Sequence, residues 1–182
     1  INQQLRLCDS VTRLREKYAK SVDTASPAVD AVSITSALLQ FHECVRYLNT
    51  RRSTGAVLNL NSEADVQDAV FLMLRPWIHD LKSETPTEKI ANRYTIKDFF
   101  SKAARTVIEI KFVRDESHGK KISEEIHDDI ENYRHHPACG TIVFFVYDAN
   151  ALIPDVAQLR EQVEEERAYS GRSIKCVLIV KP

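Results

Sequence analysis

The chain has 182 residues, of which 43% are hydrophobic and 28% charged, and its formal net charge at pH 7 is −1. These values are typical of a soluble globular protein with one domain, or one domain and an appendage. No apolar run reaches the length of a membrane span, so we expect no membrane contact and a cytoplasmic location. The near-neutral charge argues against strong intrinsic affinity for DNA, because DNA-binding domains are more often basic.

The first fifty residues predict an α-helical hairpin. Apolar side chains recur at three- and four-residue steps over residues 5–18 and 34–48, and Pro27 lies between the two stretches. The apolar stripe of such a hairpin packs either on the rest of the protein or on a second copy, which would make a homodimer. We therefore divide the chain into an N-terminal helical hairpin, 1–58, and a main domain, 59–182.

The main domain is predicted to open with a helix that begins near Ser62 and buries a stripe of apolar residues. That stripe consists of Val66, Val70, Met73 and Trp77. A first strand is expected over residues 78–83, followed by a polar excursion over 84–93 in which Glu84 is a candidate ligand or a solvated loop residue.

Two short strands follow, over residues 94–100 and 105–113, and a tight turn at 101–104 joins them. Side chains alternate along a strand, so the second strand has two different faces. One face carries Ile108, Ile110 and Phe112, and the other carries Val107, Glu109 and Lys111.

If this hairpin is centred between Ala103 and Ala104, Asp98 lies opposite Glu109. Opposed side chains in such a pair have Cβ atoms about 4.5–5.5 Å apart. Two carboxylates at that separation repel each other unless a cation lies between them, and Mg²⁺ prefers such oxygen ligands. Lys111, on the same face, could orient a water molecule or stabilise developing negative charge.

The remaining elements alternate between helix and strand. We expect a turn-rich loop at 115–121, a helix at 122–136, a buried central strand at 141–147, a helix at 154–168 and a last strand at 174–180. This order predicts an α/β fold in which helices flank a mixed sheet.

A zinc site is a weaker alternative. His135, His136 and Cys139 cluster, with His118 and His127 nearby in the sequence. Structural zinc usually needs four ligands in paired spacings, and the second pair is missing. We interpret the cluster as a helix end and a turn.

The pattern Asp98 followed by Glu109-x-Lys111 resembles the signature of the PD-(D/E)xK nuclease superfamily. The stretch after it, ISEEIHDDIENYRHHPACGTIVFFVYD, is similar to the helix and core strand that follow the motif in bacterial restriction and defence nucleases. The resemblance covers about two thirds of the chain, with Lys97 in place of the proline that names the motif. It implies a restriction-endonuclease-like fold and a metal-dependent nuclease, for which DNA is favoured over RNA as the expected substrate.

The resemblance also implies roles for individual residues. Asp98, Glu109 and the carbonyl of Ile110 would bind Mg²⁺ or Mn²⁺, and Lys111 would act on the attacking water or the transition state. In the resembled proteins the helix before the first core strand often carries an acidic residue that faces the metal, and Glu63 is the matching position.

Glu63 also has a purely structural explanation. Acidic residues are favoured in the first turn of a helix, and Ser62 with Asp65 is a plausible capping box. Gln67, one turn further along, is a lesser candidate for the site.

Three functions remain open at this point. The first is an active nuclease that serves as the effector domain of a larger bacterial defence or restriction protein. A further domain upstream of Ile1 is expected because the sequence has no initiator methionine. The second is a catalytically silent domain of the same fold that binds nucleic acid or protein, and the third is an assembly module built on the N-terminal helices.

Overall fold

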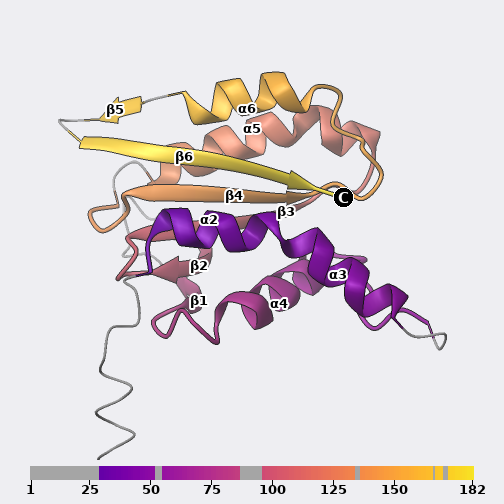
Figure 1. Ribbon diagram of the computed structural model, residues 1–182. Helices are drawn as coiled ribbons and strands as arrows, with labels where there is room; N and C mark the ends of the chain where they lie inside the picture. Colours follow the sequence, from indigo (N-terminus) through magenta and orange to yellow (C-terminus); the bar gives the residue numbers. More distant parts are fainter. Residues whose placement is uncertain (1–28, 52–54, 87–95, 134–135, 166, 170–171) are drawn as a thin grey trace, which may run out of the picture.

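The computed structural model describes residues 29–51, 55–86, 96–133, 136–165, 167–169 and 172–182 (Figure 1). Within these ranges a mixed sheet of six strands lies between two layers of helices. The strands are β1 (Lys82–Pro86), β2 (Ile96–Ser101), β3 (Thr106–Phe112), β4 (Thr141–Tyr147), β5 (Arg167–Tyr169) and β6 (Arg172–Lys181). The helices are α2 (Ala31–Leu39), α3 (Phe41–Thr50), α4 (Glu63–Leu74), α5 (Glu116–Tyr133) and α6 (Val156–Glu164).

The strand order in the sheet is β1-β2-β3-β4-β6-β5. β1, β2 and β3 are antiparallel neighbours, β3, β4 and β6 are parallel, and β5 pairs antiparallel with β6. The two parallel connections run through α5 and α6, which lie together on one face, while α2 and α4 lie on the other (Figure 1). The predicted α/β fold with a mixed sheet is confirmed. None of the helices in the described ranges is both long and apolar enough to cross a bilayer.

Each face of the sheet has its own hydrophobic core. In β3, Val107 packs with α5 and α6, whereas Ile108 and Ile110 pack with α2 and α4. The predicted alternation along β3 is therefore present. Because α5 covers the Val107 face, Glu109 on that face is only 4% exposed. The Glu109 side chain therefore does not lie on an exposed face of the hairpin.

The second half of the predicted helical hairpin packs on the sheet. The first half lies outside the described residues. Gln40 separates α2 from α3, where a single helix was expected. Ile34, Leu38 and Phe41 are buried, and the rings of Phe41 and Phe145 meet edge to face with centroids 4.9 Å apart. Of the two predicted partners for this stripe, the described part thus contacts the chain's own core. The domain boundary at residue 58 stays a prediction.

The first strand begins later than predicted, at Lys82 instead of residue 78. The Nη1 atom of Arg75 donates to the carbonyls of Ile78 and His79 at 3.3 and 2.9 Å, which holds this stretch in a turn at the end of α4. Ile78 is nevertheless buried, which explains its apolar signal.

The loop predicted at 115–121 was wrong, because α5 already begins at Glu116. The Asp115 carboxylate accepts hydrogen bonds from the His118 N–H at 2.9 Å and from the Ser117 hydroxyl, and so caps the helix. Gly119, at the end of the first turn, has to be a glycine because its α-carbon faces the Leu152 carbonyl. A Cβ atom there would approach that oxygen to 2.3 Å.

The helix predicted to reach residue 168 was also too long, since α6 ends at Glu164. Its continuation is drawn into the sheet as β5, which pairs with the start of β6. The Glu164 carboxylate accepts the Leu178 N–H at 2.8 Å, so the end of the helix is fixed to the strand below it.

Candidate active site

The candidate site lies where β2 and β3 separate. The two strands pair through Phe99 with Ile108 and through Phe100 with Val107, which is the predicted register. One step further, this register sets Asp98 opposite Glu109. The backbone pairing ends there. The Asp98 carboxylate, instead of a backbone carbonyl, accepts the Ile110 N–H at 2.6 Å.

This hydrogen bond also fixes the direction of the Ile110 carbonyl. In an extended strand the N–H and C=O of one residue point to the same neighbouring strand. Because the Ile110 N–H points to Asp98, its carbonyl oxygen is directed into the gap between β2 and β3. Two carboxylates and one carbonyl are thus placed around the point where the strands part.

Asp98 has further neighbours on α4. Its other carboxylate oxygen accepts a hydrogen bond from Nε2 of Gln67 at 3.0 Å. Burial raises the pKa of Asp98 to about 6, and the charge of Glu63 adds to the rise, although the Ile110 N–H opposes it. Glu63, exposed and one turn before Gln67, is therefore close enough to act electrostatically on the site, and the lesser candidate Gln67 is in direct contact with it.

The structural explanation of the α4 terminus holds as well. The Ser62 hydroxyl accepts the Asp65 N–H at 3.2 Å, and the Asp65 carboxylate accepts the Asn61 N–H at 3.0 Å. The cap involves Asp65 and leaves the Glu63 side chain out of these contacts. Capping and a role of Glu63 at the site are compatible.

Glu109 is buried beneath α5. The Tyr133 hydroxyl donates a hydrogen bond to its carboxylate. Burial and, next, the Asp98 charge raise the pKa of Glu109 to about 8, although the Tyr133 hydrogen bond opposes the change. The carboxyl groups of Asp98 and Glu109 are thus mutually destabilised when both are ionised.

Lys111 forms an ion pair that the sequence interpretation missed. Its Nζ lies 2.7 Å from Oδ2 of Asp129, and the two side chains are 15% and 19% exposed. Burial lowers the pKa of Lys111, but the carboxylates around it, Asp129 first and then Glu109 and Glu63, together outweigh this effect, so the net pKa is raised. Lys111 is therefore an ammonium ion at neutral pH.

Two residues of the cluster thus come from α5, one turn apart. Tyr133 is buried, and the Asp129 side chain is 19% exposed. Their partners were not predicted, since they depend on how α5 crosses β3. The i, i+4 spacing of Asp129 and Tyr133 is the signal that could have indicated a common target.

Within the described ranges, no three His, Cys, Asp or Glu side chains are placed to hold a metal ion together. This covers His136 and Cys139 of the zinc alternative, whereas His135 and the side chain of Glu84 lie outside the description. A cation at the candidate site would use Asp98, Glu109 and the Ile110 carbonyl.

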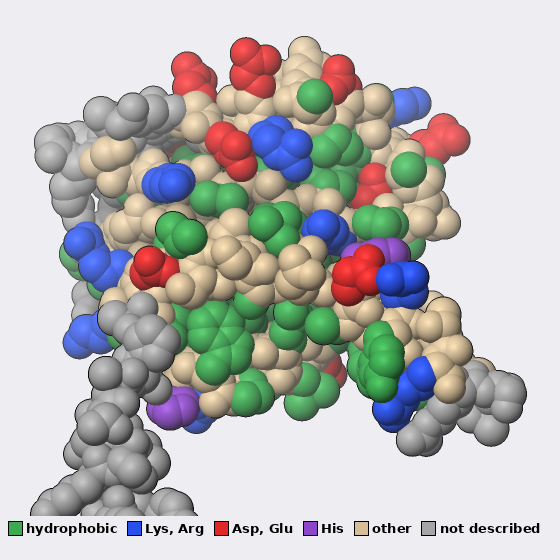
Figure 2. All heavy atoms as spheres, viewed as in Figure 1, with side chains coloured by type: hydrophobic (Ala, Val, Ile, Leu, Met, Phe, Trp, Pro, Cys, Tyr) green, Lys and Arg blue, Asp and Glu red, His purple; other side chains and the backbone are tan. Residues whose placement is uncertain are grey.

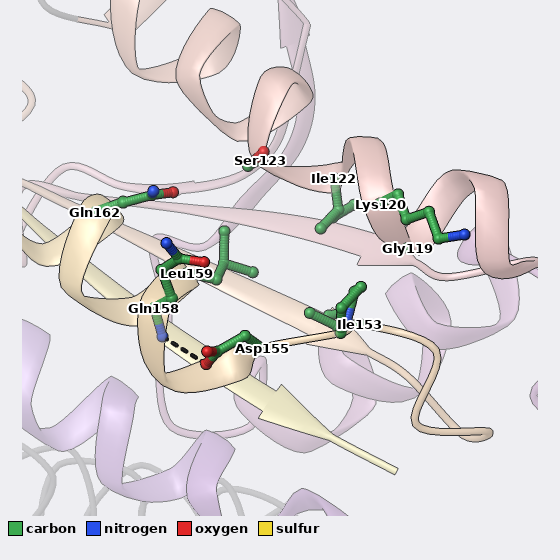
Figure 3. Close-up of a pocket in the computed structure, with 10 residues that line it drawn as sticks. Gly119, Lys120, Ile122, Ser123, Ile153, Asp155, Gln158, Leu159 and Gln162 are labelled. Atoms are coloured by element: carbon green, nitrogen blue, oxygen red, sulfur yellow. Dashed lines mark hydrogen bonds between the residues drawn. The ribbon is translucent and has the colours of Figure 1, made fainter.

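Two hollows help to locate the accessible side of the site. One opens beside Asp98 and is lined by Gln67, Asp68, Phe71, Ser83, Asp98 and Phe99. The other, shown in Figure 3, is a groove between α5 and α6 in which Asp155 accepts the Gln158 N–H at 2.8 Å as the cap of α6. This groove contains none of the cluster residues, whereas the hollow beside Asp98 is lined by two residues of the site, Asp98 and Gln67.

The surface over α6 is poorly suited to a DNA backbone. Figure 2 shows acidic side chains gathered along the top of the molecule, where Figure 1 places α6, and Lys and Arg side chains scattered over the face in view. Phosphate contacts depend on clustered Lys and Arg. The described residues of the face seen in Figure 2 show no such cluster, so this face is poorly suited to bind a DNA backbone.

Comparison with known proteins decides the family. The family model described as REase_DpnII-MboI matches residues 32–182. The chain belongs to the DpnII-MboI restriction endonuclease family. Neither the curated proteins nor the solved structures gave a match.

Membership of the DpnII-MboI family confirms the restriction-endonuclease-like resemblance and makes the chain a nuclease with DNA as its substrate class. The matched region starts within α2, so the helix that packs on β4 and β6 belongs to the part of the chain shared with the family. It also contains every residue of the cluster described above.

Proposed function

We propose that the chain hydrolyses phosphodiester bonds in DNA with Mg²⁺ or Mn²⁺, at the cluster of Asp98, Glu109 and Lys111. One observation carries this proposal: the buried Glu109 and the half-buried Asp98 lie opposite each other where β2 and β3 separate, and their pKa values are raised to about 8 and about 6. Burial dominates both shifts, and the Asp98 charge adds to that on Glu109. An arrangement that disfavours both negative charges is stabilised by a cation.

The donor atoms fit a hard divalent cation. Asp98, Glu109 and the Ile110 carbonyl supply only oxygen atoms, which Mg²⁺ and Mn²⁺ prefer, and water molecules can complete the coordination. When bound, the ion would polarise the scissile phosphate and lower the pKa of a bound water molecule. The neighbouring contacts support this assignment, because Gln67 orients Asp98 and Tyr133 orients Glu109.

Lys111 acts as a cation in this proposal. Because its pKa is raised by Asp129 against the effect of burial, it is not suited to remove a proton from water. Its ammonium group can orient the attacking water through a hydrogen bond and stabilise the charge that develops on the phosphate oxygens. Glu63, exposed at the start of α4, would bind a second ion or a water molecule.

The wider setting also belongs to the proposal. We place the nuclease in the cytoplasm, as the effector domain of a larger defence or restriction protein, with a helical appendage over residues 1–58. A homodimer through the N-terminal helices is supported by the exposed apolar side chains of Val32 and Tyr47 on α2 and α3, which are 64% and 61% exposed. Sedimentation over a range of concentrations tests the dimer.

Plasmid cleavage in Mg²⁺, Mn²⁺ or EDTA tests the proposed activity. Lys111→Ala should lower the cleavage rate by about 10²–10³-fold or more while the protein stays folded. The matched control is Lys175→Ala, which removes an exposed lysine from β6, outside the cluster. Retained activity in Lys111→Ala would remove the proposed mechanism. A folded wild type that neither cleaves nor binds Mn²⁺ would favour the silent domain.

A further inference from the structure

The positive charge of Lys111 acts on both Asp98 and Glu109, yet its ammonium group pairs with a different residue. Its Nζ is 2.7 Å from Asp129 Oδ2. Among the described residues, no ion pair within 4.0 Å joins Lys111 to Asp98 or Glu109, although the Glu109 charge acts on Lys111. The lysine is close enough to interact with the acids and is held away from them.

Both contacts that keep the charges apart come from one turn of α5. Glu109 and Lys111 are two positions apart in β3, so their side chains point to the same face and are natural partners for an ion pair. Tyr133 donates to Glu109, and Asp129 holds Lys111. In a site this buried, opposite charges attract more strongly than in water, so the separation must be enforced.

We propose that Asp129 is a positioning residue that holds Lys111 away from Asp98 and Glu109 and thereby keeps both carboxylates open to a divalent cation. This rests on the proposed metal-dependent function of the same cluster. Without the Asp129 carboxylate, the Lys111 ammonium moves to the nearest negative charges and becomes a built-in competitor of the metal ion.

Competition between Lys111 and the metal ion predicts a result that the loss of the Asp129 charge alone does not predict. Asp129→Asn keeps the size of the side chain and should lower the affinity for Mn²⁺ at least about tenfold, because the freed lysine neutralises the carboxylates. In a Lys111→Met background there is no lysine to release. There the same substitution should change the affinity by less than about threefold, the contribution of one charge that is not a ligand.

Isothermal titration of Mn²⁺ into the full chain checks this with the wild type, the two single variants and the double variant. An equal loss of affinity from Asp129→Asn in both backgrounds would overturn the proposal, since Asp129 would then act through its own charge. In that outcome the wild type still binds Mn²⁺, and the proposed metal site stands. A wild type without Mn²⁺ binding would overturn both.

Two further variants guard against a trivial explanation. Glu125→Gln removes a carboxylate one turn earlier on α5, where it lies 3.2 Å from His118 Nε2, and should leave the affinity within about threefold. Asp129→Glu retains the negative charge and should restore most of the affinity lost in Asp129→Asn. If Asp129→Glu binds as weakly as Asp129→Asn while thermal unfolding shows both folded, the proposal is wrong.

Discussion

Glu109, in β3, and Asp148, just after the end of the neighbouring strand β4, are equally buried, each 4% exposed. Asp148 follows β4, and its carboxylate accepts the N–H groups of Leu152 and Ile153 at 2.8 and 3.0 Å. Glu109 has the Tyr133 hydroxyl as a donor but faces the negative charge of Asp98. The Asp148 carboxylate organises a loop through these two hydrogen bonds. Burial and the nearby Asp98 charge, by contrast, disfavour the ionised form of Glu109.

The comparison shows that burial of an acid does not by itself mark an active site. Two backbone donors compensate a buried carboxylate for the loss of water, and such a group stabilises the fold. A buried carboxylate beside a second one is destabilised when ionised, and either protonation or a bound cation relieves this. The raised pKa of Glu109, caused by burial and then by Asp98, is therefore what supports the proposed binding role of this residue.

The largest expected effect separates the two carboxylates by activity. Glu109→Gln should lower DNA cleavage by about three orders of magnitude, because a neutral amide is a poor ligand for a divalent cation. Asp148→Asn should keep the rate per folded molecule within about threefold, since this loop residue lies outside the cluster. Single-turnover cleavage, normalised to folded protein by circular dichroism, measures both. Equal losses in the two variants would remove the distinction.

The second effect is on stability, where substitution of Asp148 should matter more than substitution of Glu109. Asp148→Ala leaves the Leu152 and Ile153 N–H groups without their acceptor, which should lower the free energy of unfolding by about 4 kcal/mol. Urea denaturation in EDTA checks this. Glu109→Gln should not destabilise the protein in the same experiment. A loss below about 1 kcal/mol for Asp148→Ala would show that water replaces the carboxylate.

The strands of the site were predictable because they depend on local patterns. The alternation along residues 105–113 and the turn before them are sufficient to predict the register that sets Asp98 against Glu109. The β-branched and aromatic run at β4 was likewise placed correctly, since a strand buried on both faces is continuously apolar.

What could not be predicted depends on contacts between distant elements. The start of α5 was missed because Gly119 and its polar neighbours resemble a loop, and only the Leu152 carbonyl explains the glycine. The pairing of Asp129 with Lys111 requires the crossing of α5 over β3, which no local pattern encodes. The two α5 residues that contact the site, Asp129 and Tyr133, could therefore be identified only from the structure.

The smallest expected effect concerns pH and again contrasts Glu109 with an ordinary carboxylate. The pKa of Glu109 is raised from 4.5 to about 8 by burial and then by Asp98, so the folded state retains a proton that the unfolded chain has already lost. Its contribution to stability is thus complete below about pH 4.5 and is lost progressively as the pH rises to about 8. The metal-free protein should lose on the order of 3 kcal/mol between pH 5 and pH 8 from this group.

Urea denaturation in EDTA at pH 5, 6, 7 and 8 measures that loss. Glu109→Gln cannot ionise and should flatten the profile, leaving the smaller slope that comes from Asp98, whose pKa is raised to about 6 chiefly by burial. Mn²⁺ should flatten the wild-type profile in the same way, because the bound cation stabilises the ionised carboxylates that the empty cluster disfavours. Parallel profiles for the wild type and Glu109→Gln would mean that Glu109 titrates like an exposed acid. The contrast with Asp148 would then have to be explained by hydrogen bonding alone.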